Sequence, residues 1–562
     1  MAIACTVVTV AVATVAQLAQ APDAAAVDVQ LLAINDFHGA LEPASGTNGR
    51  IGATDAGGIE YLATHLARLK AGNPNTLIVS AGDNIGGTPL LSSLSHDEAS
   101  VEALNLAGLQ VSAVGNHELD EGWWELQRMQ KGGCHPVDGC QDGTPFGGAT
   151  FTYLSANITL DPGRADPAMV AQASLAGTGI QPLVPAFAIR EVGGVRIGFI
   201  GVTLQEAPSM IIPASIRGLT FGPEIDTVNA AARRLREQGV RAIVVLIHEG
   251  GTPSSTDING CDGLSGDIVS LAHRASADID VIVSGHTHRA YNCTIGNKLV
   301  TSAASTGRLI TDIDLRIQPV DGEVVSKSAR NVVVSRDVAR DPRETALLAH
   351  YRPVSEKVGG RIVGTIAASL LRAANDAGES PLGDVIADAM LEAGRNTPGG
   401  DAVIALTNIG GIRADIVRPA GGGASPVTYA QLFEVTPFGN TVIVKTLTGD
   451  SLLQVLEQQF GAGRPRLLQV SDGFAYSYDA SRPPAQRIDR ASVRINGVQV
   501  VPTQRYRVAT TDFLWTSGDG FTGLGAATDP VTVGVDVDVF ADYFSRHSPV
   551  TPGRQNRIRT TR

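Results

Sequence analysis

Hydrophobic and polar positions follow two alternating patterns along the first half of the chain. Short runs rich in β-branched residues each end at a polar or glycine-rich turn, at residues 27–34, 76–82, 111–115, 195–202, 240–247 and 279–285. Such runs are typical of buried strands. Between them, segments such as 58–70 and 225–239 carry apolar residues at helical spacing and charges on the other face. The alternation predicts an α/β layered domain over residues 27–325.

The second half has strand-like and helix-like segments of its own, which predict a separate domain over residues 362–562. The chain shows no internal repeat. The strand-like runs of the second half lie at 401–408, 440–449 and 505–513, and its helix-like segments lie at 381–394 and 451–460. A charged segment with a helical pattern separates the two halves. We predict that residues 326–361 form a linker helix.

Composition narrows the class of protein and of partner. With 562 residues, 43% of them hydrophobic and 18% charged, the chain is typical of folded globular proteins. Lys plus Arg total 44 against 56 for Asp plus Glu, which gives a net charge of −12. That charge repels polyanions at long range, so a nucleic-acid polymer is not expected as a partner. Small phosphorylated ligands remain compatible, because bound metal ions supply local positive charge.

The first residues resemble an export signal. Residues 2–20 are apolar and hold no Lys or Arg, and Ala24 and Ala26 suit the small-residue rule for cleavage. We therefore predict a signal peptide over residues 1–26, secretion into an extracytoplasmic space such as the cell wall or periplasm, and no stable membrane association after cleavage. The basic region that usually precedes such a run is missing, since the first basic residue is Arg50. An uncleaved membrane anchor is the alternative.

The cysteines also fit an oxidising compartment. Cys5 lies in the predicted signal, which leaves four cysteines and three possible pairings. We favour Cys134 with Cys140, across a Gly/Pro-rich loop, and Cys261 with Cys293. A zinc site is the alternative, but neither pair has the spacing of a zinc knuckle.

Five motifs place metal-binding side chains directly after strand-like runs: NDFHG, GDNIGG, GNHELD, IHEGG and SGHTH. The side chains are Asp36, His38, Asp83, Asn116, His117, Asp120, His248, His286 and His288. Carboxylate, amide and imidazole ligands suit Zn, Mn, Fe or a similar divalent ion better than calcium. A lone histidine after a strand is more often structural, but five such sets favour a shared metal centre. The remaining histidines lack this setting and are predicted to be structural or on the surface: His65, His96, His135, His273, His350 and His547.

The order of these motifs resembles that of the calcineurin-type metallophosphoesterases. Together with NIGGIR at 408–413 and SGDGF at 517–521, the chain resembles the bacterial 5′-nucleotidase and UDP-sugar hydrolase family across nearly its whole mature length. The resemblance implies a four-layer α/β/β/α metallophosphoesterase domain followed by an α+β nucleotide-binding domain. It also implies a metal-dependent phosphoric ester hydrolase that releases phosphate from nucleoside 5′-monophosphates or related nucleotides.

The resemblance implies roles for the metal-binding residues. Two divalent ions, Zn, Mn or similar, would be held by one set made of Asp36, His38 and His288 and a second made of Asn116, His248 and His286, with Asp83 bridging. A hydroxide shared by the ions would attack phosphorus in line, without a phospho-enzyme.

The next residues along the third motif have a different implied role. His117, paired with Asp120, would stabilise the transition state and the leaving oxygen as a cationic imidazole. Capping of the following helix is the structural alternative for Asp120.

The second half supplies the implied nucleotide pocket, which the resemblance assigns to Asn408, Arg413, Phe438, Phe513 and Asp519. Arg413 would bind phosphate, the two aromatic rings would stack on the base, and Asp519 would bind the ribose hydroxyls. A salt bridge for Arg413 and a place in the core for both rings are the structural alternatives.

One departure from the family pattern concerns phosphate binding. The family usually carries another arginine shortly before the turn that opens the second domain, but residues 375–384 read NDAGESPLGD. The nearest candidate is Arg372. If it does not reach the phosphate, Arg413 acts more nearly alone and the substrate differs from a simple nucleoside monophosphate.

The metals and the nucleotide pocket fall on different halves, so hydrolysis requires the two domains to close over the linker. A static structure with the two half-sites far apart is therefore one expected outcome. The alternative substrates on the same scaffold are 2′,3′-cyclic nucleotides, UDP-sugars or a sulfur ester. Outside enzymes, a catalytically dead binding protein is the alternative, and the presence of all seven expected ligands and of His117 weighs against it.

Overall fold

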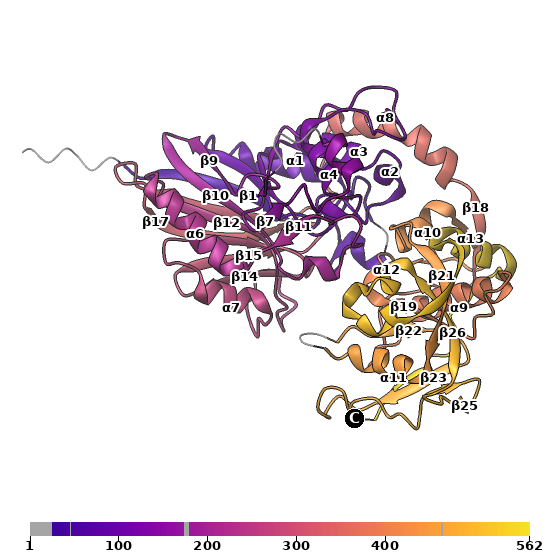
Figure 1. The fold of residues 1–562 in the computed structure, drawn as a ribbon. Helices are drawn as coiled ribbons and strands as arrows, with labels where there is room; N and C mark the ends of the chain where they lie inside the picture. Colours follow the sequence, from indigo (N-terminus) through magenta and orange to yellow (C-terminus); the bar gives the residue numbers. More distant parts are fainter. Residues whose placement is uncertain (1–24, 45, 174–178, 462–464, 562) are drawn as a thin grey trace, which may run out of the picture.

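Two lobes joined by one long helix make up the molecule (Figure 1). The computed structural model describes residues 25–44, 46–173, 179–461 and 465–561. The predicted signal peptide falls mostly on residues 1–24, which lie outside the described residues. Among the described residues, no helix combines the length and the apolarity needed to cross a bilayer.

Two six-stranded sheets form the centre of the N-terminal lobe. The first runs in the order β17 (Val324–Val333), β16 (Leu309–Ile317), β1 (Val27–Ile34), β4 (Thr76–Ser80), β5 (Val111–Ala113) and β6 (Thr152–Leu154). The second runs in the order β14 (Ala290–Ile295), β15 (Lys298–Ala303), β13 (Val281–Ser284), β12 (Ala242–His248), β10 (Val195–Thr203) and β9 (Phe187–Val192). β1, β4, β5 and β6 are parallel neighbours, as are β10, β12 and β13.

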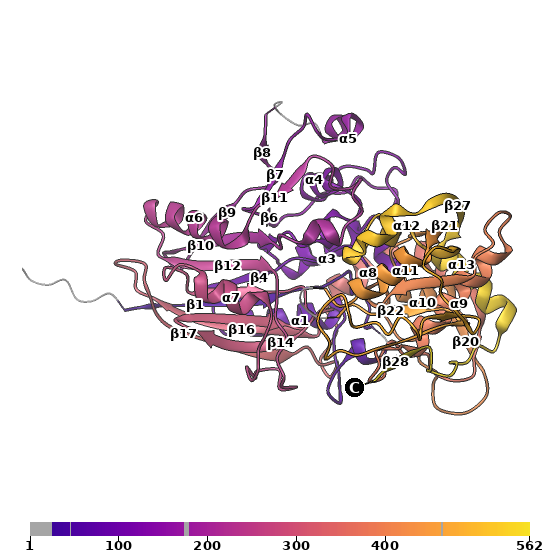
Figure 2. The same cartoon turned by 60° about the horizontal axis from the view of Figure 1, so that its bottom comes forward.

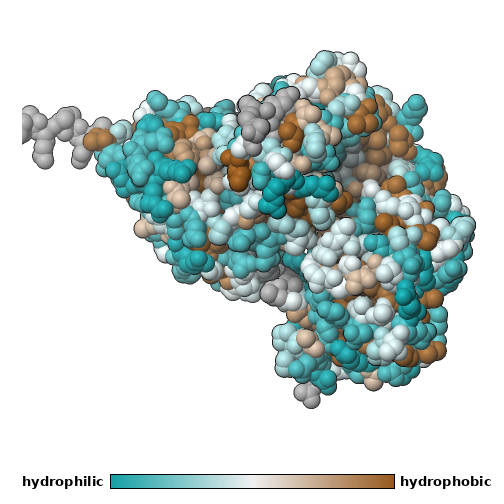
Figure 3. All heavy atoms as spheres, in the orientation of Figure 1, coloured by the Kyte–Doolittle hydropathy of each residue, from teal (hydrophilic) through white to brown (hydrophobic). Residues whose placement is uncertain are grey.

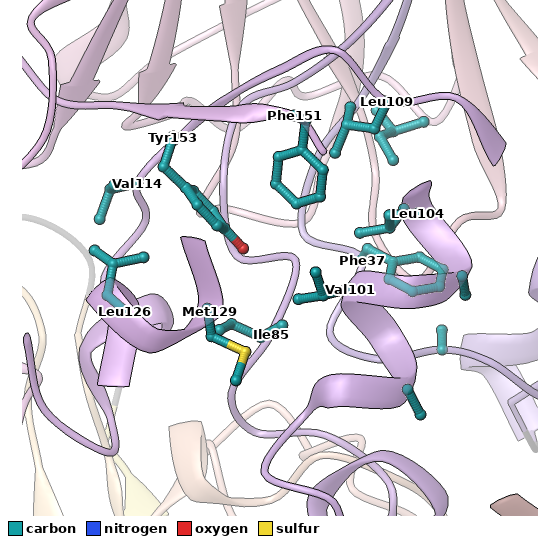
Figure 4. Close-up of a cluster of buried hydrophobic side chains, with 14 of the residues drawn as sticks. Phe37, Ile85, Val101, Leu104, Leu109, Val114, Leu126, Met129, Phe151 and Tyr153 are labelled. Carbon is teal, nitrogen blue, oxygen red and sulfur yellow. The ribbon is translucent and has the colours of Figure 1, made fainter. Parts of the chain in front are cut away.

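The inner faces of these sheets pack on each other, and helices cover the outer faces. Val29, Leu31, Phe199 and Val244 belong to the buried cluster between the sheets. α1 (Ile59–Lys70), α3 (Glu98–Ala107) and α4 (Trp123–Lys131) cover the first sheet, while α6 (Glu224–Glu237) and α7 (Asp267–Arg274) cover the second. Figure 4 shows part of the cluster under α3 and α4, including Phe37, Leu104 and Tyr153. These layers are the predicted α/β/β/α arrangement.

A small three-stranded sheet and one short helix form an insertion that lies apart from the two main sheets. It consists of β7 (Ile158–Leu160), β8 (Gln181–Pro182), β11 (Leu219–Phe221) and the short helix α5 (Pro167–Gln172), and it lies at the top of Figure 2. Its chain segments leave the end of β6 and return before α6.

The C-terminal lobe is α+β, as predicted. Its main sheet runs in the order β22 (Leu468–Val470), β19 (Ile404–Asn408), β26 (Arg505–Thr511), β21 (Thr441–Thr448) and β27 (Thr528–Val535). α9 (Pro381–Asn396), α10 (Tyr429–Val435) and α13 (Asp536–His547) pack on one face, and α11 (Gly449–Gln458) and α12 (Asp512–Trp515) pack on the other.

Two small sheets complete this lobe. They are the pair β18 (Ile362–Ile366) and β20 (Ser425–Thr428), and the four-stranded sheet β25 (Val498–Gln499), β24 (Arg494–Ile495), β23 (Phe474–Tyr478) and β28 (Ile558–Thr560).

Helix α8 (Pro342–Gly359) links the lobes and contacts both. Leu348 and Tyr351 are buried in the N-terminal lobe against α1 and α3, and the C-terminal end of α8 reaches α10. β17 continues the first sheet past residue 325, the predicted end of the first domain, to Val333. The prediction of a linker helix over residues 326–361 is therefore wrong for residues 326–333, which pair with β16 as a strand. The visible surface is mainly hydrophilic with scattered hydrophobic residues (Figure 3).

Two disulfides join Cys134 with Cys140 and Cys261 with Cys293. Both of the favoured pairings are confirmed.

Candidate active site

Five loops that follow strands of the N-terminal lobe converge on one place. They follow β1, β4 and β5 of the first sheet and β12 and β13 of the second. Because these strands run parallel within each sheet, their carboxyl ends lie at the same edge. The side chains brought together there are the predicted ligands Asp36, His38, Asp83, Asn116, His248, His286 and His288.

Two groups made of the predicted ligands have their ligand atoms within 4.8 Å of one another, close enough to hold an ion. One is Asp36, His38 and His288, and the other is Asp83, His248 and His286. A third group of the same kind joins His38 and Asp83 to His117. Nε2 of His38 lies 3.2 Å from Nε2 of His288, and Oδ2 of Asp83 lies 2.9 Å from Nε2 of His248 and 3.7 Å from Nε2 of His38. Asp83 therefore lies between the two groups.

The histidine tautomers suit metal binding. Nδ1 of His38 donates to the Gly86 carbonyl at 2.9 Å, and Nδ1 of His248 donates to the Ala81 carbonyl at 2.9 Å. Each ring therefore points Nε2 into the site. In His38 burial lowers the pKa and leaves Nε2 unprotonated, whereas Asp83 raises the pKa of His248 to about 10, so an ion would have to displace a proton from Nε2 of His248. Metal-binding histidines are usually held in this way, with the other ring nitrogen donating to a carbonyl or carboxylate.

Several buried polar atoms lack a partner among the described residues. Oδ1 of Asn116 makes no hydrogen bond, and neither does Nε2 of His248, which faces Asp83 without the geometry of a hydrogen bond. Unpaired buried polar atoms are costly, so this pair of atoms fits a divalent ion as the missing partner. The residues present therefore fit a divalent metal centre.

The loop backbones are strained at the ligands. Asp36, His38, Asp83, His286 and His288 all have positive φ, between 48° and 68°. Non-glycine residues adopt this conformation at a cost, and such strain gathers at functional sites. The Asp83 carboxylate packs directly against the backbone of Gly115, where a Cβ would lie 2.1 Å from Oδ1 of Asp83. Only glycine therefore fits at this position.

His117 and Asp120 form the expected pair. Nδ1 of His117 lies 2.7 Å from Oδ2 of Asp120. Burial opposes the charged imidazole, but the charges of Asp120 and Asp83 outweigh it and raise the pKa of His117. Nη2 of Arg413 lies 2.7 Å from Nε2 of His117, so in this arrangement the ring is neutral at Nε2, with its proton on Nδ1. Because a guanidinium can only donate, this contact requires a lone pair on Nε2 of His117 while the lobes are closed.

The C-terminal lobe closes over the same place. A cavity of about 310 Å³ is lined by His117 and Asn116 from one lobe and by Arg413, Phe438 and Phe513 from the other. Asn408 and Asp519 also line it, and Nδ2 of Asn408 donates to Oδ2 of Asp519 at 2.8 Å. The expectation of half-sites far apart is wrong for this structure, because Arg413 and His117 bring the two lobes into contact.

The aromatic rings differ in their surroundings. Phe438 stacks on His117, with ring centroids 5.6 Å apart, and Cζ of Arg413 lies 5.1 Å from its centroid. Phe513 lines the cavity beside Gly518. Neither ring belongs wholly to the core, which was the structural alternative.

Arg372 lies in a neighbouring cavity of about 130 Å³, together with His38, His288 and Arg413. Its Nη1 donates to the carbonyl of Arg413 at 2.9 Å. It thus lies beside the first group of ligands and supports the Arg413 backbone.

Two residues of the site escaped the sequence analysis. Glu118 accepts hydrogen bonds from the amides of Asp83, Asn84 and Gly115, and Arg466 donates to the Asp519 carbonyl at 3.2 Å. Glu118 stood inside the GNHE motif, which could have indicated a role. Nothing local marks Arg466.

Comparison with known proteins gives consistent matches. Residues 29–290 match the calcineurin-like phosphoesterase family, and residues 361–526 match the 5′-nucleotidase C-terminal domain. The chain is 31% identical to endonuclease YhcR of Bacillus subtilis over 95% of its own length, but it spans only 41% of that protein. It is 30% identical to cell wall protein Lmo0130 of Listeria monocytogenes, covering 92% of this chain and 67% of that protein.

Among solved structures, a 5′-nucleotidase precursor from Thermus thermophilus matches with a TM-score of 0.77 and 26% identity. The match covers 95% of this chain and 99% of the other.

Proposed function

This chain belongs to the calcineurin-like phosphoesterases that carry a 5′-nucleotidase C-terminal domain, a family of metal-dependent phosphoester hydrolases, and from that membership we propose that it releases phosphate from nucleoside 5′-monophosphates. The observation that carries the proposal is the cavity shared by the two lobes. Metal-binding side chains and His117 line one wall, and two phenylalanines with Asp519 line the other.

The cavity suits a single nucleotide. Its volume of about 310 Å³ is at the small end of small-molecule pockets. Aromatic rings stack on any base, so Phe438 and Phe513 would accept several nucleotides. Asp519, held by Asn408 at 2.8 Å, would accept hydrogen bonds from ribose hydroxyls.

The metal centre would use the residues assigned from the sequence. Asp36, His38 and His288 would hold one divalent ion, Asn116, His248 and His286 would hold a second, and Asp83 would contact both. Bound there, such ions polarise phosphoryl oxygens and lower the pKa of water.

Arg413 and His117 would position the phosphoryl group and protonate the leaving oxygen. Nε of Arg413 is buried and has no hydrogen-bond partner among the described residues, so it is available to a phosphoryl oxygen. Asp120 holds the proton on Nδ1 of His117, which leaves Nε2 facing Arg413. A phosphate between them would separate the guanidinium from the ring, and Nε2 could then take a proton and donate it to the leaving oxygen.

We also propose that the protein acts outside the cytoplasm. The two disulfides support this, because disulfides persist in oxidising compartments. One relative is named as a cell wall protein.

The test is phosphate release from AMP by the purified chain with Mn²⁺, with and without a chelator. We expect rapid release that the chelator abolishes, and a kcat about 10²–10⁴-fold lower for His117→Ala. UDP-glucose and 2′,3′-cyclic AMP run in parallel. Hydrolysis of either of these first yields a phosphomonoester rather than free phosphate, so their products are separated by chromatography. Hydrolysis of one of them but not of AMP would replace the proposed substrate, and hydrolysis of none would overturn the proposal.

A further inference from the structure

A second cluster of metal-binding side chains lies at the wall of the nucleotide cavity, away from the candidate metal centre. It consists of His96, His135 and Asp138, whose ligand atoms lie within 4.8 Å of one another. His96 precedes α3, and the other two lie in the loop that follows α4. His96 and Glu121 both line the cavity. The sequence analysis assigned both histidines only a structural or surface role.

The two imidazoles converge on one carboxylate oxygen. Nε2 of His96 lies 3.0 Å and Nδ1 of His135 lies 3.3 Å from Oδ2 of Asp138. The rings stack at a centroid distance of 3.8 Å with an angle of 13° between their planes. Two imidazoles this close cannot both be protonated without repulsion, whereas a shared cation would attract both lone pairs.

The present hydrogen-bond partners of the two imidazoles suit the binding of an ion. Nδ1 of His96 lies 2.6 Å from Oε2 of Glu121 and Nε2 lies 3.0 Å from Oδ2 of Asp138, so without an ion each nitrogen carries a proton, and the two carboxylates raise the pKa of the ring to about 9. A bound ion would displace the proton on Nε2, while Glu121 keeps the proton on Nδ1. This carboxylate–histidine arrangement is the one that orients zinc-binding histidines. Nδ1 of His135 accepts the amide of Asp138 at 3.1 Å and is therefore unprotonated, and an ion would replace that amide as its partner.

The loop that carries two of the three ligands is held firmly. The disulfide Cys134–Cys140 closes it, and the backbones of His135 and Gly139 exchange hydrogen bonds of 3.2 and 2.9 Å. The side chain of His135 is buried, with Trp124 at a ring distance of 5.5 Å. Rigid ligands lower the entropy lost on binding an ion.

We propose that His96, His135 and Asp138 bind a further divalent cation of the zinc type, with Glu121 orienting His96. Two imidazoles and a carboxylate are the ligand set of many zinc sites. The ion ties the disulfide loop to the start of α3 in the cavity wall. Asp97, next to His96, accepts hydrogen bonds from the amide of Gly86 and the hydroxyl of Thr88, so the ion also steadies the loop after β4.

The test is zinc content, measured by mass spectrometry after equilibrium dialysis of the full chain against Zn²⁺. We expect wild type to hold one equivalent more than His135→Ala and Asp138→Ala. His547→Ala is the matched control, because His547 is exposed and its ring lies 2.6 Å from the carboxylate of Glu392; its zinc content should equal that of wild type. The difference does not depend on how many ions the catalytic centre holds, and AMP hydrolysis reports on that centre separately.

Asp138→Ala protects the test from a folding failure. Asp138 is exposed and the disulfide keeps its loop closed, so this variant should retain the wild-type circular dichroism spectrum. Equal zinc content in wild type and folded Asp138→Ala would overturn the proposal and leave the cluster as an ion pair.

Discussion

Glu118 joins two loops of the metal centre with a single carboxylate. It accepts the amides of Asp83 at 2.9 Å, Asn84 at 2.7 Å and Gly115 at 2.6 Å. In Glu118→Gln the side-chain NH₂ replaces one of the two accepting oxygens and faces a backbone N–H that can also only donate. The lost hydrogen bond lets the two loops move apart. We expect metal affinity and kcat to fall about 10–100-fold, as for other residues that orient ligands. Metal titration and AMP hydrolysis measure both.

A matched control separates this effect from general destabilisation. Glu102 accepts a hydrogen bond from Tyr351 at 3.1 Å, away from the metal centre. Glu102→Gln should keep wild-type metal affinity. Wild-type affinity in Glu118→Gln as well would contradict the positioning role.

Glu344 predicts a pH dependence of stability. It is fully buried near the start of α8, and neither carboxylate oxygen has a hydrogen-bond partner among the described residues. Burial first, and then the charge of Asp341, raise its pKa from 4.5 to about 8. The folded state therefore holds the proton more tightly. The contribution of protonated Glu344 to the free energy of unfolding is fully present below pH 4.5 and is lost as the pH rises through about 8.

Glu344→Gln removes this ionisation. We expect its free energy of unfolding to exceed that of wild type by about 1–3 kcal/mol at a pH of about 8.5 and to differ little at a pH of about 4.5, because a buried charge without partners is costly. Urea unfolding at the two pH values measures this. An equal difference at both would show that ionisation plays no part.

At the scale of residues, the sequence predicted what depends on local position. Asp36, His248 and His288 could be identified because each lies at or just after the carboxyl end of a strand, and parallel strands bring these ends together. The contact between Arg466 and Asp519 joins a loop before β22 to a turn after α12, and only tertiary packing creates it. The same holds for the stacking of His96 on His135.

At the scale of elements, helix α10 positions two residues of the pocket. The amide of Arg413 donates to the carbonyl of Val435 at its end, and Phe438 follows directly. A capping box fixes its start, where the Thr428 side chain accepts the Gln431 amide and the Gln431 side chain accepts the Thr428 amide.

Thr428→Ala should cost about 0.5–2 kcal/mol of stability, because the first turn of α10 loses a cap. The KM for AMP should rise more than kcat falls, since Arg413 and Phe438 are the residues proposed to bind the phosphate and the base. Urea unfolding and steady-state kinetics measure the two effects. Thr428→Ser keeps the hydroxyl and should behave like wild type; equal losses in both variants would argue against the cap.

The helices and buried strands followed from the pattern. Residues 58–70 and 225–239 correspond to α1 (Ile59–Lys70) and α6 (Glu224–Glu237). The edge strand β17 (Val324–Val333) was not identified, because most of its side chains are at least partly exposed and its sequence lacks a buried run. Its pairing with β16 is a long antiparallel register that periodicity alone does not reveal.

At the scale of the whole molecule, the lobes meet in a closed arrangement that no local pattern specifies. Nδ2 of Asn48 donates to the carbonyl of Arg413 at 2.6 Å, and Nη2 of Arg413 donates to Nε2 of His117 at 2.7 Å. Sequence indicated that the half-sites belong to different lobes. Which arrangement is populated depends on the small difference between such contacts and solvation, which the sequence does not display.

Gly359 lies where three helices of the two lobes meet, and it sets how closely they approach. A Cβ there would lie 2.7 Å from Leu90 of α2 (Leu90–Ser93) in one lobe and 2.8 Å from Ala430 of α10 in the other. Gly359→Ile therefore pushes the lobes apart, although it favours helix α8 itself. Since small displacements of a bound substrate are costly, we expect kcat/KM for AMP to fall about 10–100-fold.

The metal content of Gly359→Ile should stay at the wild-type value, because all candidate ligands belong to one lobe. Its radius of gyration from X-ray scattering should increase. Gly147→Ile is the matched control, since a Cβ at Gly147 meets nothing within 4 Å. Unchanged kcat/KM and radius in Gly359→Ile would mean that the contact of α8 with α2 and α10 does not govern closure, and that catalysis tolerates a wider cleft than the contact between Arg413 and His117 implies.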